Sequence, residues 1–190
     1  VEQQVYDIMS RGYQVHCHCN GDEASEAFIK AVEKTLNRIP AVNHRAVMQH
    51  AQMLREDQFK RIKEMGMGVN FFSNHIYYWG DQHYSKTMGP ERAMRMDACG
   101  SAVRHGIPFA FHSDCGITPI NPLFTGWCAV NRLTASGRVL GEAENGDGEL
   151  AYFSIRTIVR VRRDLRRIRR AVVEPAVFPE TLWTFVSFVL

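Results

Sequence analysis

"QVHCHCNGDEA", residues 14–24, places two histidines and two cysteines in four consecutive positions, directly before a helix-like segment. Such a cluster could be a zinc site, a redox pair or an ordinary strand. In a strand, His16 and His18 share one face, and Cys17 and Cys19 share the other. The C-x-C spacing suits a redox pair poorly. We therefore interpret residues 13–19 as a β-strand with its cysteines toward the core.

The same strand-then-helix pattern recurs along the next 120 or so residues. The strand-like runs are 13–19, 45–51, 67–73 and 107–114, and the helix-like segments are 22–39, 55–66, 92–106 and 121–137. Asp22 is expected to cap the first helix, and a long loop is expected over residues 74–91. Four βα units predict a parallel sheet with helices outside it. This pattern fits both a small doubly wound sheet and half of a (β/α)₈ barrel.

Composition indicates a soluble globular protein with one sizeable core. The chain has 190 residues, of which 45% are hydrophobic, and no run of about 18 apolar residues predicts a membrane span. Residues 1–12 do not resemble a secretory signal. The five cysteines lack disulfide spacing, which favours a reducing cytoplasm. Because the chain starts at Val1 inside a helix-like stretch, we expect it to be a fragment of a longer protein.

The last forty residues differ in charge from the rest. Residues 151–190 hold eight Arg, no Lys and three acidic residues, so this basic tail is considered separately from the body. A segment such as RTIVRVRRDLRRIRR could bind nucleic acid or an anionic surface. It lacks the interleaved aromatic residues of a stacking surface, so nucleic-acid binding is the less favoured interpretation.

Polar side chains stand at the ends of the expected strands. His18 ends the first strand, His50 the second and Asp114 the fourth, while His75 follows the third. In parallel α/β folds, ligands bind at the carboxyl ends of the strands. Two imidazoles and a carboxylate gathered there suit a divalent cation such as zinc. The sequence thus predicts a metal site built from His18, His50 and Asp114.

Several motifs in this order resemble those of metal-dependent amidohydrolases, in a branch that includes N-substituted formamide deformylase. HCNGDEA (18–24) resembles the family's H-A-x-G-D-x-A segment, and HRAVMQHAQ (44–52) its R-x-x-x-E-H-A-Q segment. FAFHSDCGITPINPL (109–123) resembles G-S-D-x-P-V, and AVNR (129–132) resembles A-V-x-R. The resemblance covers about residues 1–143.

The resemblance implies the second half of a TIM-like (β/α)₈ barrel, with the strands here as strands five to eight. It assigns His18, His50 and Asp114 to the metal site, and Asp114 also to catalysis. The family's H-x-H pair on strand one and its strand-four ligand have no counterpart here. The family's C-terminal G-K-x-A-D pattern is also missing, so we expect residues 1–143 to form a partial barrel and residues 144–190 an atypical basic tail, helical near 155–170.

The resemblance implies hydrolysis of an amide or cyclic amide bond by water that a divalent metal activates, and zinc is the expected metal. Asp114 would act first as general base and then as general acid. His75, Trp79 and His112 are the expected substrate-binding residues, and His112 stands where the family motif has glycine. The fragment alone is expected to be weak or inactive. The alternatives are a non-catalytic binding module that uses the tail, an inactive metal-binding half-barrel, and a homo-oligomer that closes the barrel.

Overall fold

A computed structural model of the chain describes residues 1–40 and 43–141. The chain divides into two units, residues 1–151 and 152–190, and all described residues belong to the first. The predictions for the basic tail, including its helix near 155–170, lie outside the described residues. Among the residues that are described, no helix is both long and apolar enough to span a membrane.

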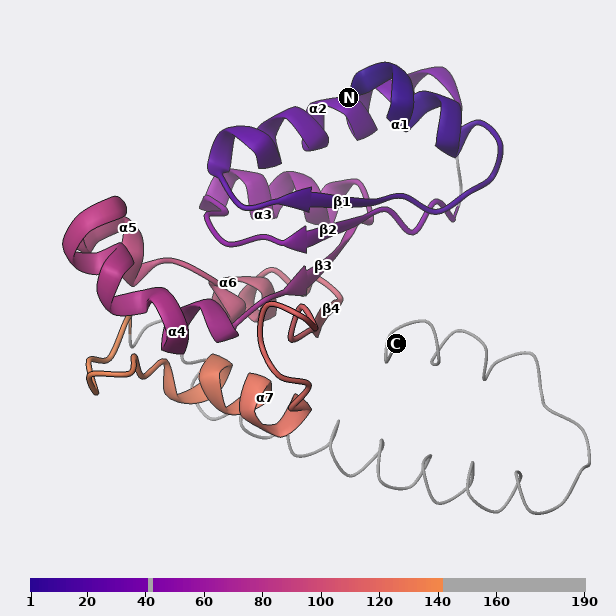
Figure 1. The fold of residues 1–190 in the computed structure, drawn as a ribbon. Helices are drawn as coiled ribbons and strands as arrows, with labels where there is room; N and C mark the ends of the chain where they lie inside the picture. Colours follow the sequence, from indigo (N-terminus) through magenta and orange to yellow (C-terminus); the bar gives the residue numbers. More distant parts are fainter. Residues whose placement is uncertain (41–42, 142–190) are drawn as a thin grey trace, which may run out of the picture. The chain divides into compact units, whose positions relative to one another are not determined.

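The centre of the fold is a four-stranded parallel sheet (Figure 1). Its strands are β1 (His16–Cys19), β2 (Val47–His50), β3 (Gly68–Phe71) and β4 (Phe109–Phe111). They lie side by side in chain order, with His18 opposite Gln49 and Gln49 opposite Asn70. The four predicted strands are confirmed, although each is shorter than its β-rich run.

Helices precede, connect and follow these strands. They are α1 (Glu2–Met9), α2 (Asp22–Arg38), α3 (Glu56–Glu64), α4 (Asn74–Gln82), the π-helix η1 (His83–Thr87), α5 (Pro90–Met94), α6 (Cys99–Arg104) and α7 (Pro122–Asn131). Buried side chains of α2, α3 and α6 form one core with Cys19, Met48, Val69 and Phe71 of the strands.

The strand order decides between the two predicted architectures. Crossovers between parallel strands are almost always right-handed, so a sheet whose order runs 1-2-3-4 without reversal places its helices on one face. A doubly wound sheet reverses its order and is covered on both faces. This chain follows the first pattern (Figure 1). It is a mixed α/β unit consistent with part of a (β/α)₈ barrel.

Four local predictions are wrong. Gly21, and not Asp22, is the N-cap of α2, and Asp22 is the first helical residue. Residues 74–91 are largely helical, in α4, η1 and the start of α5. The single helix expected over 92–106 is interrupted, because Asp97 has a left-handed backbone with φ of 49°. Left-handed backbone at Arg132, with φ of 52°, also ends α7 earlier than expected.

Gly80 of α4 lies against the segment that follows α7. A Cβ atom at position 80 would lie 2.6 Å from Thr134 Cγ2 and 2.9 Å from Leu140 Cδ1. Gly80→Ala is therefore expected to lower the free energy of unfolding by about 1–3 kcal/mol, although alanine favours helix. Urea denaturation measures this. Adding Thr134→Ser, which removes the obstructing methyl group, should recover part of the loss, and an unchanged or higher stability of Gly80→Ala would contradict the contact.

Glu26 links α2 to α3 through an ion pair. Its carboxylate accepts hydrogen bonds from Arg61 Nη1 at 2.7 Å and Gln58 Nε2 at 3.2 Å, and these bonds, chiefly that with Arg61, lower the pKa of Glu26 to about 2. Because this pKa lies below the ordinary value of 4.5, the stabilisation is complete above pH 4.5 and disappears as the pH falls toward 2.

Glu26→Gln is expected to lower the free energy of unfolding by about 1–3 kcal/mol at pH 7. The difference from the wild type should shrink as the pH falls from 4.5 toward 2. Urea titrations at several pH values test this. Glu64→Gln is the matched control, because the Glu64 side chain is 60% exposed and pairs with Lys60 only at 4.0 Å. A pH-independent loss for Glu26→Gln would show that charge is not the cause.

Candidate functional site

Four histidines meet at the carboxyl ends of the strands. The ring of His50, at the end of β2, lies 4.4 Å from that of His18, 4.8 Å from that of His112 and 6.2 Å from that of His75, measured between centroids. His18 belongs to β1, His75 follows β3 and His112 follows β4. Residues separated by almost a hundred positions in the sequence thus form one cluster, which we call the histidine cluster.

The backbone of His50 explains how it joins this cluster. In a regular strand His50 would point to the same side as the cysteine opposite it, Cys19, which is buried against the helices. The backbone of His50 and Ala51 instead has φ of 68° and 54°, a left-handed conformation that residues other than glycine rarely adopt. The strand alternation breaks at this point, and the imidazole reaches His18. Such strained backbone is often found at functional sites.

Asp114 stands on a turn just after β4, and it too has a left-handed backbone, with φ of 48°. Its N–H donates to His112 Nδ1 at 3.2 Å, and its carbonyl accepts from the N–H of Ile117 at 2.8 Å. Asn74 Nδ2 donates to the Thr118 hydroxyl at 2.8 Å, and that hydroxyl donates to the Ser113 carbonyl. The first residue of α4 thereby anchors the loop that carries Asp114.

Burial favours the neutral imidazole at two members of the cluster, His50 and His112. Burial, assisted by the neighbouring His112 and His18, lowers the pKa of His50 to about 4. Burial likewise lowers the pKa of His112 to about 4. The Asp114 carboxylate opposes both shifts, which places its charge within range of both rings. His50 and His112 are therefore neutral at pH 7, and a histidine must be neutral to bind a metal ion.

His50 carries a polar atom that fits a metal ion. Its Nδ1 is buried and finds no hydrogen-bond partner among the residues that the structure describes, a situation that is rare for buried polar atoms. Within residues 1–40 and 43–141, no three His, Cys, Asp or Glu side chains are arranged to hold a metal ion. The cluster therefore fits a metal in the chemistry of its donors, but it offers only part of a ligand set.

Aromatic rings line one side of the histidine cluster. Phe72 is buried, and its ring centroid lies 4.3 Å from that of His75, 5.2 Å from that of His112 and 5.9 Å from that of His50. Trp79, on α4, lies 5.9 Å from His75 and 6.1 Å from Phe72. The structure thus brings the predicted residues His75, Trp79 and His112 together. Phe72 carries no functional signal in the sequence, because it looks like an ordinary core residue of a strand.

The other side chains of the opening motif point to the two opposite faces of β1, as predicted. Cys19 is buried in the core and Cys17 packs against it. On the other face, His16 Nδ1 lies 2.6 Å from Gln49 Nε2, and Gln49 Oε1 accepts from Asn70 Nδ2 at 2.7 Å. This polar row crosses β1, β2 and β3. His16 is nevertheless exposed, since the face of β1 that carries it is not covered by the described residues.

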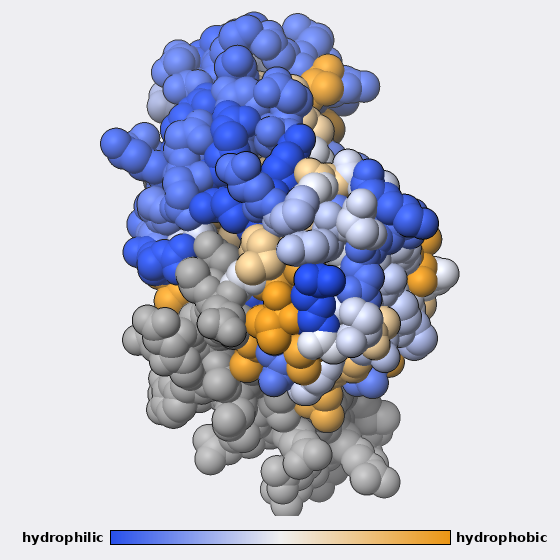
Figure 2. Space-filling view, turned by 90° about the vertical axis from the view of Figure 1, so that its left-hand side faces the viewer, coloured by the Kyte–Doolittle hydropathy of each residue, from blue (hydrophilic) through white to orange (hydrophobic). Residues whose placement is uncertain are grey.

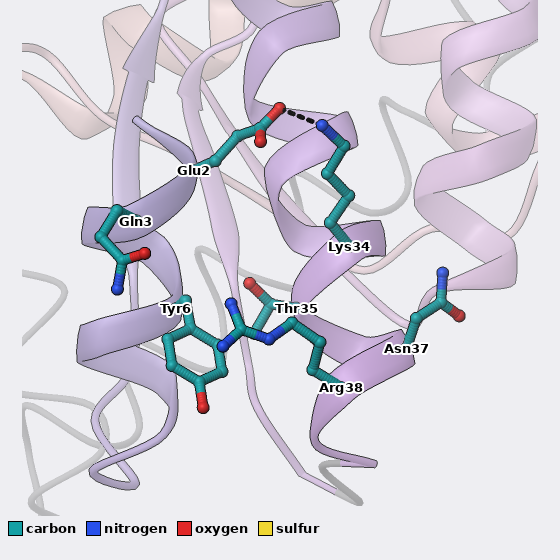
Figure 3. A pocket seen from close by; sticks show the side chains of 7 residues that line it. All are labelled: Glu2, Gln3, Tyr6, Lys34, Thr35, Asn37 and Arg38. Atoms are coloured by element: carbon teal, nitrogen blue, oxygen red, sulfur yellow. Dashed lines mark hydrogen bonds and ion pairs between the residues drawn. The ribbon is translucent and has the colours of Figure 1, made fainter.

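The surface has other features, which lie outside the histidine cluster. A depression of about 500 Å³ lies between α1 and α2 and is bordered by Glu2, Tyr6 and Lys34 (Figure 3). At its edge, Lys34 pairs with Glu2 at 2.6 Å, and the guanidinium of Arg38 lies over the Tyr6 ring.

Exposed hydrophobic residues form a second surface feature. Ile117 and Ile120, after β4, are more than 60% exposed. Figure 2 shows one face of the molecule, on which hydrophobic residues gather beside a larger hydrophilic area.

Comparison with known proteins gives these features a context. A family model described as the amidohydrolase family matches residues 7–161. The fold is similar to that of an uncharacterized metal-dependent hydrolase from Pyrococcus furiosus, with 22% identity and a TM-score of 0.60 over 76% of this chain and 28% of that one.

A second uncharacterized metal-dependent hydrolase, from Pyrococcus horikoshii OT3, gives 20% identity and a TM-score of 0.58 over 80% of this chain and 29% of that one. The chain thus spans less than a third of the length of either structure. No curated protein matches it significantly. The family match covers most of the chain and includes all four histidines of the cluster and Asp114. The chain therefore belongs to the amidohydrolase family.

Proposed function

We propose that this chain supplies the second half of the barrel, strands five to eight, of a metal-dependent hydrolase that cleaves an amide or cyclic amide bond. The observation that carries the proposal is the contact between the rings of His18 and His50, with centroids 4.4 Å apart, at the carboxyl ends of β1 and β2; Asp114 stands on the turn after the neighbouring part of the sheet, just beyond β4. The remaining strands would come from the rest of a longer protein or from a second copy of the chain.

In this proposal His18 and His50 hold the metal, and Asp114 approaches it from the loop after β4. The buried Nδ1 of His50, which has no hydrogen-bond partner among the described residues, and the low pKa of His50, about 4, support the assignment. A bound divalent cation, which we take to be zinc, would acidify a water molecule and polarise the carbonyl group of the substrate. Further ligands would come from the strands that complete the barrel.

Asp114 is the residue proposed to move the proton. A carboxylate oxygen of Asp114 would accept a proton from the attacking water and then release it to the leaving nitrogen of the amide. His75 and Trp79 would contact the substrate, which is a small molecule with an amide-type bond. His112 accepts a hydrogen bond from the Asp114 backbone, so it would act on the substrate and on the position of Asp114 together.

The test compares the 190-residue chain with a longer protein in which all eight strands are present. Both are assayed against formamides and cyclic amides, with added zinc and after chelation. We expect zinc-dependent turnover from the longer protein and little from the chain alone, because an incomplete ligand set binds a metal weakly. Absence of turnover by the longer protein across the panel would contradict the assignment to amide hydrolysis.

A further inference from the structure

The most unusual titratable group outside this proposed mechanism is Asp97, between α5 and α6. Its side chain is fully buried, and its backbone is left-handed with φ of 49°. Its N–H donates to the Gln52 carbonyl at 2.8 Å, and its carbonyl accepts from Arg132 Nη1 at 3.0 Å. Two distant parts of the chain thus hold this one residue in place, the segment after β2 and the end of α7.

The carboxyl group of Asp97 contacts the histidine cluster. Its Oδ1 lies 3.4 Å from His75 Nδ1, and its Oδ2 finds no hydrogen-bond partner among the described residues. His75 is itself only 8% exposed. Burying a carboxylate costs several kcal/mol unless it is paired, so an aspartate with a single weak acceptor bond is not explained by stability alone.

The charges around Asp97 come from several elements. Burial raises the pKa of Asp97, whereas His75, the Arg132 guanidinium and His83 act to lower it. The thiol of Cys128, on α7, responds to the same charge, since Asp97 adds to the effect of burial in raising the pKa of Cys128 to about 12. The carboxyl group is thus surrounded by an imidazole on one side and by a fixed cation on another.

We propose that Asp97 is a positioning residue that holds His75 in one orientation and one tautomer. Its carboxylate accepts the Nδ1–H of His75, so Nε2 carries no proton and is the nitrogen left to meet a substrate. The aromatic rings of Phe72 and Trp79 pack against the same imidazole, with centroids at 4.3 and 5.9 Å. Fixing a histidine tautomer through a partner on the other ring nitrogen is a recurrent device in catalytic and metal sites.

This arrangement adds a substrate preference, and that part of the inference rests on the proposed function. An unprotonated Nε2 is a hydrogen-bond acceptor. The unprotonated Nε2 of His75 would therefore accept a hydrogen bond from the N–H of a primary, secondary or cyclic amide. The His75 ring lies 6.2 Å from the His50 ring, so such a substrate would be bound beside the proposed metal ligand. An N-alkylated analogue lacks that donor, and a site built around a specific hydrogen bond discriminates against such analogues.

The tautomer is measured directly by long-range proton–nitrogen NMR on the 190-residue chain labelled with ¹⁵N-histidine, at a pH where the imidazoles are neutral. His75→Gln assigns the resonances. We expect Nδ1 to carry the proton in the wild type and the Nε2-protonated form to become populated in Asp97→Ala. Asp57→Asn, on the exposed surface of α3, should leave the spectrum of His75 unchanged.

A wild-type His75 protonated at Nε2 would overturn the proposal, because it would mean that Asp97 is a neutral acid that donates to Nδ1. An unchanged tautomer in Asp97→Ala would overturn it as well. Asp97→Gly also removes the acceptor and suits the left-handed backbone at this position, so it is used if Asp97→Ala does not fold. A shift toward the Nε2-protonated form in that variant supports the pairing, and the wild-type tautomer retained in it opposes the pairing.

The substrate preference is tested in the longer protein with a cyclic amide and its N-methyl analogue. His75→Ala should lower kcat/KM for the N–H substrate by tenfold or more and alter that for the N-methyl analogue much less. An equal loss for both would remove the role of Nε2 as an acceptor. The tautomer measurement needs neither metal nor turnover, so failure of the proposed hydrolysis and failure of the Asp97–His75 pairing are distinguishable.

Discussion

Replacing Asp114 with asparagine is expected to lower kcat for amide hydrolysis by about 10²–10⁴-fold in the protein with a complete barrel. Asparagine has the same shape as aspartate but cannot accept the proton of the attacking water. It also tolerates the left-handed backbone at this position, where φ is 48°. The loop should therefore keep its structure, and the loss should fall on kcat more than on folding.

Steady-state kinetics with and without zinc check this prediction, and circular dichroism checks the fold. Asp57→Asn is the matched control, since the Asp57 side chain is 61% exposed and pairs with Arg55 on the surface. Its kcat should stay within about twofold of the wild type. If Asp114→Asn retained full activity, the proton would have to pass through another group, and the role given to Asp114 would be wrong.

Replacing Arg132 with methionine is expected to lower the free energy of unfolding by about 3–5 kcal/mol. Arg132 is fully buried, and its guanidinium donates to the carbonyls of Asp97 at 3.0 Å, Met96 at 2.7 Å and Leu140. Removing it leaves these acceptors buried without a donor and takes a cation away from the Asp97 carboxyl group. The AVNR motif therefore has a structural role here.

Urea denaturation of Arg132→Met and of Arg92→Met measures the effect. Arg92 pairs with Asp22 at 3.0 Å, but its side chain is 54% exposed, so its loss should cost less than about 1 kcal/mol. Equal effects for the two variants would show that burial does not set the contribution of Arg132. The Asp97–His75 pair should also respond, because Arg132 binds the backbone of Asp97.

Periodicity in the sequence predicts the regular part of this fold well. The apolar positions of residues 22–39 and the β-rich runs around residues 47 and 69 correspond to α2, β2 and β3. Periodicity does not predict the helix interruption at Asp97 or the helix end at Arg132, where residues other than glycine adopt a left-handed backbone conformation. Tertiary contacts impose these backbone conformations, so no local sequence pattern predicts them. Helix α4 was missed because its aromatic residues obscure a helical spacing.

The candidate site could be predicted in part, because the regular strands place some of its residues and left-handed backbone places others. His18 and His50 stand at strand ends, and parallel strands gather their carboxyl ends at one edge. Alternation along β2 would nevertheless send His50 to the wrong face, and only its left-handed backbone returns it to His18. Asp97 gave no signal, since it falls inside the single helix expected over residues 92–106, and an aspartate in a helix usually lies at the surface.

His18 and His50 are proposed to form part of one metal site together. This proposal is tested most directly by titrating zinc into the ¹⁵N-histidine-labelled chain and following every histidine ring by NMR. We expect zinc to shift the rings of His18 and His50, and we expect His18→Ala to abolish the shift at His50. The control His105→Ala, at the residue after α6 that pairs with Glu56 at 2.8 Å, should leave the shift unchanged. Zinc that shifted only His44 and His105, or that bound with unchanged affinity in His18→Ala, would contradict the proposal.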